Sequence, residues 1–154
     1  MAEETLPRLL RQSFERWGDR QVAIRDKDFG IWQEYTWKDS YEKVKWFSLG
    51  LISLGLKPED KVAIIGDNEP EWYWAALAAQ AAKGIVVAQF TDAIPEELKY
   101  LIDFADCKFI IARDQEQVDK ILVIKDEIPK VEKVIYWYYK GMRSYNQPFL
   151  MRFD

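Results

Sequence analysis

Short apolar stretches alternate with helix-like segments through the second half of this sequence, and no other feature constrains the fold as strongly. The stretches are predicted to be strands at Val62–Ile65, Ile85–Phe90, Phe109–Ala112 and Val131–Trp137. Predicted helices separate them at Pro70–Lys83, which has alanines on every side, at Pro95–Phe104, which has apolar residues on one side, and at Gln115–Lys125. Strands that are apolar throughout are typical of parallel sheets covered on both faces. We therefore predict an α/β fold with a mostly parallel, doubly wound sheet, helices on both faces and right-handed crossovers.

The N-terminal part of the chain follows a different plan, with an N-terminal helix and a β-hairpin before the sheet. The predicted elements are a helix at Leu6–Trp17, hairpin strands at Gln21–Arg25 and Gln33–Thr36, and a long helix at Trp37–Leu54. The expected start and stop residues are Thr5 and Gly18, then Thr36 with Asp39 and Gly55, then Asn68 with Pro70 and Gly84. The tail at 138–154 has no clear period and is predicted to be loosely packed.

Composition excludes several classes of function. The chain has 154 residues, which suits one domain, and a formal net charge of −4 without a basic face for nucleic acid. It contains no histidine, so Ser-His-Asp triads, Cys-His pairs and His-ligated zinc are all excluded. Its single cysteine, Cys107, cannot form an internal disulfide and is expected to pack in the core.

No targeting or membrane segment is predicted. The N-terminus is acidic and lacks the apolar core of a signal peptide, and every apolar run is far shorter than the ~20 residues that span a membrane. A soluble, cytoplasmic protein is expected. Aromatic residues reach 15% and include seven tryptophans, some outside the clearest core positions, which hints at a surface that a neighbour covers.

The turn Gly66–Trp72 is the first place to look for a ligand, because open parallel sheets bind ligands beyond the carboxyl ends of their strands. It has a single glycine, whereas dinucleotide and P-loop sites need glycine-rich turns. Asp67, Glu69 and Glu71 would repel phosphate but are favourable beside a helix N-terminus. Capping is therefore the preferred interpretation, with ligand contact as the alternative.

Other acidic positions are interpreted structurally. Asp103 and Asp106 could do acid–base or metal chemistry, but no third ligand is evident, so solvated helix-end charge is preferred. The stretch Asp114–Glu116 is expected to begin the next helix, and Thr91-Asp92 to begin the turn before Pro95. A phosphorelay receiver domain is a remote alternative, since the hairpin and the helix before it do not fit that plan.

The ordered residues resemble the N-terminal region of acyl-CoA synthetases of the long-chain fatty-acid type, in the adenylate-forming (AMP-binding) superfamily. The resemblance is carried by Tyr35-Thr36-Trp37, Gly50-Leu51, Leu54–Trp72, Ala78, Ala82–Gly84, Val86-Val87, Thr91, Pro95–Leu101, Glu116–Lys120 and Tyr139–Asn146. It runs from about Thr5 to the end. Two positions depart from the pattern: Glu59 stands where glycine is common, and Ala88-Gln89 replaces a small or proline-containing turn.

The resemblance implies that residues 1–154 are a partial domain, the N-terminal piece of a larger ligase. In the family, the phosphate loop, the nucleotide-binding motifs, the magnesium-binding acid and the C-terminal lysine lie downstream of the matched region. ATP, magnesium and CoA are thus implied for the full-length enzyme and none for this chain. No catalytic, cofactor-binding or metal-binding residue is expected here, and the chain alone is predicted to be inactive.

The implied partners are the remainder of the enzyme chain and, in the full-length form, a fatty acid and the periphery of a membrane. Exposed apolar and aromatic surface also predicts a homodimer. The alternative function is a stand-alone, non-catalytic binding or interaction module on the same scaffold.

Overall fold

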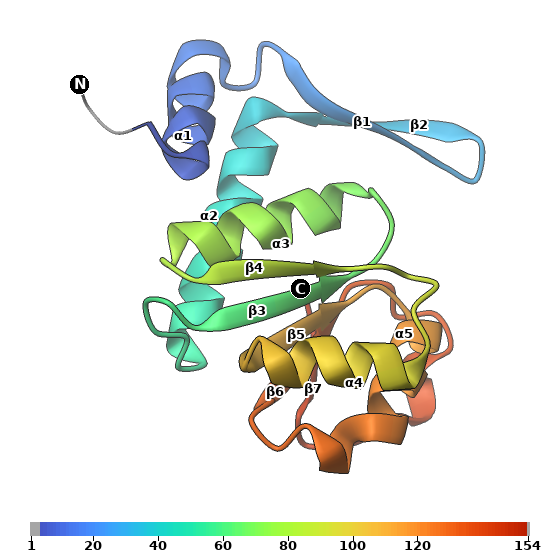
Figure 1. Cartoon of the computed structure of the whole chain (residues 1–154). Coiled ribbons are helices and arrows are strands. Elements are labelled where there is room, and N and C mark those ends of the chain that lie inside the picture. The colour runs from blue at the N-terminus through green and yellow to red at the C-terminus, as the bar shows by residue number, and fades with distance from the viewer. Residues whose placement is uncertain (1–3, 154) are drawn as a thin grey trace.

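The computed structural model, which describes residues 4–153, confirms an α/β fold built on a parallel sheet (Figure 1). Its helices are α1 (Leu6–Trp17), α2 (Trp37–Ser53), α3 (Pro70–Ala81), α4 (Pro95–Phe104) and α5 (Gln115–Ile124), with short 3-10 helices η1 (Lys125–Glu127) and η2 (Met142–Ser144). Its strands are β1 (Val22–Asp28), β2 (Ile31–Thr36), β3 (Lys61–Ile65), β4 (Ile85–Gln89), β5 (Cys107–Ala112), β6 (Lys133–Tyr136) and β7 (Leu150–Arg152). Strands β3 to β7 form a parallel sheet in the order β4-β3-β5-β6-β7.

Each central strand buries both of its faces, in two separate layers. Side chains that alternate along a strand point to opposite faces. On β3, Val62 and Ile64 pack toward α2 and α3, whereas Ala63 and Ile65 pack toward α4 and α5. This two-sided burial is the reason that the strands appear as unbroken apolar runs in the sequence.

The hairpin β1–β2 stands apart from the main sheet and projects beyond it (Figure 1). Its loop is shorter than predicted, because Phe29 and Gly30 alone connect the strands and both have positive φ, at 47° and 81°. The strands therefore extend through residues that were predicted to form the turn. Such a two-residue loop follows the right-handed twist of its strands.

Helix starts and stops are partly as predicted. The capping box at Thr36 is confirmed: its hydroxyl accepts from the Asp39 N–H at 3.1 Å, and its own N–H donates to the Asp39 carboxylate at 2.8 Å. Thr5 occupies the N-cap position of α1, but its side chain makes no capping bond. The left-handed residue after α3 is Lys83, with φ of 64°, instead of the expected Gly84.

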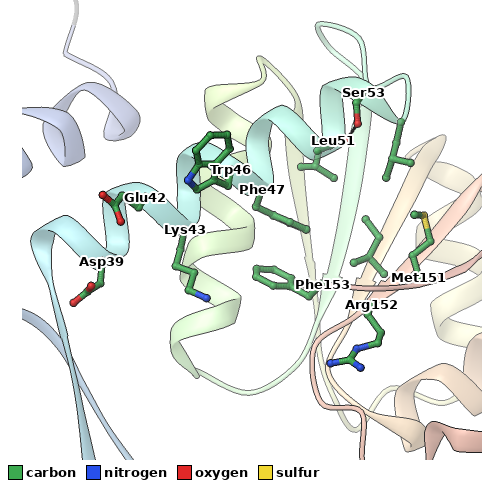
Figure 2. Close-up of a pocket in the computed structure, with 13 residues that line it drawn as sticks. Asp39, Glu42, Lys43, Trp46, Phe47, Leu51, Ser53, Met151, Arg152 and Phe153 are labelled. Atoms are coloured by element: carbon green, nitrogen blue, oxygen red, sulfur yellow. Dashed lines mark hydrogen bonds between the residues drawn. The ribbon is translucent and has the colours of Figure 1, made fainter.

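The C-terminal tail contributes a fifth parallel strand, which corrects the expectation of a loose segment for residues 150–152. Strand β7 pairs with β6, and main-chain bonds of 2.9 Å join Val134 N–H to Phe149 O and Phe153 N–H to Tyr136 O. The ring of Phe153 stacks on Phe47 of α2 at 4.0 Å between centroids (Figure 2). Pairing with β6 and packing under α2 order a sequence that has no period of its own.

Gly66, directly after β3, lies against side chains from the turns that follow β5 and β6, and it leaves room for them because it has no side chain. A β-carbon there would lie 2.3 Å from the nearest ring atom of Trp137 and 3.1 Å from the β-carbon of Arg113. The absence of a side chain thus allows the Trp137 indole to lie across the end of β3.

We expect Gly66→Ala to lower the free energy of unfolding by about 1–3 kcal/mol, because the added methyl group displaces a held ring. The matched control is Gly50→Ala within α2, where a β-carbon meets nothing within 4 Å and alanine favours the helix. Urea denaturation of both variants measures the difference. Equal stability of the two variants would contradict the proposed crowding at Gly66.

Candidate functional site

The strand order places the sheet's topological switch point between β3 and β5. The chain leaves β3 for α3 on one face and leaves β5 for α5 on the other, while β4 lies on the far side of β3. In open α/β sheets, ligands bind in the crevice that opens between two such strands at their carboxyl ends. The turns Gly66–Trp72 and Arg113–Asp114 meet at this point, so it is the first candidate site.

A network centred on Arg113 fills this crevice. Its Nε and Nη2 donate to Glu69 Oε1 at 2.9 and 2.5 Å, and its Nη1 donates to Asp114 Oδ2 at 2.7 Å. Asp67 Oδ2 lies 3.5 Å from Nε. Charge-assisted bonds from a planar guanidinium are among the stronger hydrogen bonds in proteins. The hydrogen bonds that Arg113 donates to Glu69 raise the pKa of the guanidinium, so it remains charged at every physiological pH.

The other groups at the crevice are also paired. Trp137 Nε1 donates to Glu69 Oε2 at 2.8 Å, which occupies the second oxygen of that carboxylate. Asp114 Oδ1 accepts the Gln117 N–H at 3.2 Å and so caps α5, as expected from the acidic stretch that precedes this helix. Both of these acids therefore have structural partners, and carboxylates in this position disfavour a phosphate ligand.

The N-cap residue predicted for α3, Asn68, is wrong. Glu69, not Asn68, occupies the N-cap position, and its carboxylate bonds across to Arg113 instead of capping the helix. Pro70 is at the first helical position as predicted. Arg113 and Trp137 were not predicted to take part in this site. The position of Arg113 directly after an apolar strand could have indicated it, because ligand sites lie at the carboxyl ends of such strands.

A cavity of about 780 Å³ lies beside this network, between the hairpin and the carboxyl edge of the sheet. Four carboxylates and two cations line it; the charged lining residues are Asp26, Asp28, Glu69, Glu71, Lys140 and Arg143. Burial raises the pKa of Glu71, and the neighbouring Glu69 adds to the effect. The lining thus has four carboxylates against the two cations Lys140 and Arg143, and Glu69 is already paired with Arg113.

Two side chains of α5 bind the turn that follows β4, a role that the sequence did not predict for them. Gln117 Nε2 and Lys120 Nζ both donate to the carbonyl oxygen of Thr91, at 3.2 and 2.6 Å. They are three residues apart on α5 and so share one face of that helix. They hold the turn after β4 against α5, with Thr91-Asp92 beginning the turn as predicted.

The remaining acidic and thiol candidates lie away from the crevice. Asp106 forms an ion pair with Lys130, which lowers the pKa of the carboxyl group, and Asp103 is exposed on α4. Cys107 is buried at the start of β5, and burial raises the pKa of its thiol to about 11. Within residues 4–153, no group of acidic or cysteine side chains is arranged to hold a metal ion.

A second groove, of about 520 Å³, runs between α2 and β7 (Figure 2). Its floor is apolar, with Phe47 and Leu51 from α2 and Met151 and Phe153 from the β7 region. Trp46 lines the groove, and 65% of its surface is exposed.

The helices of the described region are all too short or too polar to cross a membrane.

We expect Glu71→Gln to stabilise the protein at neutral pH. Because the folded-state pKa of Glu71 is raised, the folded chain binds this proton more tightly than the unfolded chain, so its contribution to stability falls as pH rises through the titration. The neutral amide removes this loss, and the gain should disappear at acidic pH, where the carboxyl group is already protonated.

The measurement is the free energy of unfolding across pH, with Glu42→Gln on the exposed face of α2 as the charge-matched control. A gain from Glu71→Gln that is the same at acidic and neutral pH, or that the control reproduces, would argue against a cost of burying this carboxylate.

Comparison with solved structures finds this fold in a ligase and in a CoA synthetase. The coronafacic acid ligase from Pectobacterium brasiliense superposes with a TM-score of 0.83 at 13% identity, over 96% of this chain and 28% of that chain. The acetoacetyl-CoA synthetase from Streptomyces lividans gives 0.81 at 18% identity, over 96% of this chain and 24% of that chain. At this identity the likeness shows the fold.

Sequence relatives carry the match further. The chain is 29% identical over 133 residues to the long-chain-fatty-acid–CoA ligase ACSBG2 of Xenopus laevis, covering 86% of this chain and 18% of the relative. It is 32% identical over 134 residues to the rat ACSBG2 ligase, covering 87% of this chain and 20% of the relative. The chain therefore spans about a fifth of the length of these relatives. Residues 10–149 match the AMP-binding enzyme family model, and the chain belongs to that family.

Proposed function

We propose that this chain is the N-terminal scaffold of a long-chain-type fatty-acid–CoA ligase. In such an enzyme the carboxylate of a fatty acid attacks ATP, which forms an acyl-adenylate and releases pyrophosphate. The thiol of CoA then displaces AMP and forms the thioester. The observation that carries the proposal is the family match over residues 10–149, together with relatives that are named as ligases of this type.

The switch-point crevice supports a scaffolding role for this part of the enzyme. Its guanidinium, indole and two best-placed carboxylates are used in bonds to one another. A group that binds substrate needs free donors or acceptors, and here three turns use them to hold their own geometry. The ATP, magnesium and CoA sites of the proposed enzyme are accordingly assigned to its other parts.

The apolar groove between α2 and β7 supports the same role. Trp46 lines this groove and is 65% exposed, and Leu49 and Ile52 elsewhere on α2 are each about half exposed, which is unusual for a helix that faces water. The relatives are about five times as long as the chain, so in a whole ligase further polypeptide is available to cover these side chains. We propose that this face packs against the remainder of the enzyme.

The direct test is an activity assay on the purified 154-residue chain with ATP, magnesium, CoA and palmitate. We expect no pyrophosphate release above a reaction without protein, because the proposal assigns nucleotide binding to other parts of the enzyme. Release that scales with protein concentration and depends on palmitate would overturn the proposal of an inactive scaffold.

A chimera tests the scaffold role in the positive sense. Residues 10–149 replace the matching segment of the Xenopus ACSBG2 ligase, and palmitate-dependent pyrophosphate release is measured. We expect the chimera to retain activity, whereas the same chimera with Gly66→Ala should lose thermal stability. A chimera that folds, as judged by circular dichroism, but has no activity would contradict the assignment to this class of ligase.

A further inference from the structure

Strand β4 forms an open edge of the five-stranded sheet. It pairs with β3 on one side, and no other strand within residues 4–153 pairs with it on the outer side. Ile85 N–H donates to the Asp60 carbonyl at 2.9 Å, so the main chain of Ile85 faces inward. Because main-chain groups of successive residues in a strand point to opposite sides, those of Val86 and Ala88 face outward. An unpaired edge of this kind is a template for another strand.

Apolar side chains are exposed along this edge and just beyond it. Ile85 at the start of the strand is 47% exposed, and Phe90 directly after it is 80% exposed. Ile94 in the following turn is 53% exposed. Natural edge strands are usually protected by charged side chains or proline, and β4 has neither within Ile85–Gln89. The edge therefore has the composition of a pairing surface.

The two ends of β4 carry opposite charge. A groove at the amino end is lined by α1, the end of α3 and Gly84, and its charged side chains are Arg8, Arg11 and Lys83, of which Arg11 also pairs with Glu15 of α1 at 2.8 Å. A groove at the carboxyl end is lined by Phe90, the following turn and α4, and its charged side chains are Asp92, Glu96 and Glu97. The lining of the first groove includes no carboxylate, and that of the second includes no cation.

We propose that a second copy of this chain binds at the β4 edge, with the two β4 strands antiparallel about a two-fold axis at Val87. In this register Val86 of one copy lies opposite Ala88 of the other, so the outward main-chain groups of both strands pair. Phe90 of one copy lies opposite Gly84 of the other, where no side chain obstructs the ring. The acidic end of each strand adjoins the basic end of its partner.

A second copy fits this edge better than an unrelated strand does. When two β4 strands pair antiparallel, the acidic end of each meets the basic end of the other, so the edge is complementary in charge to a second copy of itself. A closed two-fold arrangement is also the commonest form of homo-oligomer. The opposite edge, β7, has three residues and is flanked by the groove under α2, which lacks this paired charge pattern. The inference is independent of the proposed ligase function, since it rests on the β4 edge as residues 4–153 form it.

Sedimentation velocity over a range of protein concentrations tests the proposal. We expect a reversible dimer that weakens as salt rises, because its charged ends are screened. Ala88→Lys should raise the dimer dissociation constant at least about tenfold by placing a charge on the exposed edge. Val123→Lys, which adds the same charge at a 73% exposed position on α5, should leave it unchanged. Phe90→Ser provides a second variant at a side chain that folding does not bury, and it should also weaken the dimer.

A charge exchange distinguishes this edge from any other apolar contact. One variant carries Asp92→Lys with Glu96→Lys, and the other carries Arg11→Glu with Lys83→Glu. Each variant alone should be monomeric, because like charges then meet at both ends of the edge. An equimolar mixture should form a heterodimer, since both ends are again complementary.

A wild-type chain that stays monomeric at every concentration would overturn the proposal. So would a dimer that Ala88→Lys and Phe90→Ser both leave intact, or charge variants that fail to associate when mixed.

Discussion

The partly buried ion pair between Arg113 and Glu69 joins turns that are far apart in the sequence, and the carboxyl edge of the sheet depends on it. Arg113 follows β5, Glu69 leads into α3, and Trp137, which also bonds to Glu69, follows β6. Once one partner of such a group is removed, the charge that remains is costly to bury. The network therefore stabilises one arrangement of the three turns and disfavours others.

This arrangement has a consequence for function. The crevice where an open α/β sheet would hold a ligand is occupied by the protein's own side chains, and the neighbouring cavity is rich in carboxylates. Two surfaces suited to contact with other polypeptide are the edges of the sheet. The β7 side has an apolar groove under α2, and the β4 side has an unpaired strand with charged ends. A member of the AMP-binding family with these features is suited to assembly with other polypeptide.

Much of the fold could be predicted from the sequence because the signals are local. Apolar runs marked β3 to β6, an apolar stripe at helical spacing marked α1 and α4, and Thr36 with Asp39 marked a capping box at the start of α2. The parts that could not be predicted depend on distant partners. Glu69 bonds to a residue 44 positions away, which no local rule for capping at Asn68 takes into account. Strand β7 has only three residues and is held by β6 and by α2, so its own sequence carries no strand period.

The most direct test of this account is a double-mutant cycle between Glu69 and Arg113, using Glu69→Gln, Arg113→Gln and the double variant. The free energy of unfolding of each is measured by urea denaturation. We predict that the two single variants each destabilise the protein and that their effects are coupled by about 1 kcal/mol or more, as expected for members of one network. Additive effects, or a loss confined to one partner, would contradict the claim that this ion pair locks the carboxyl edge of the sheet.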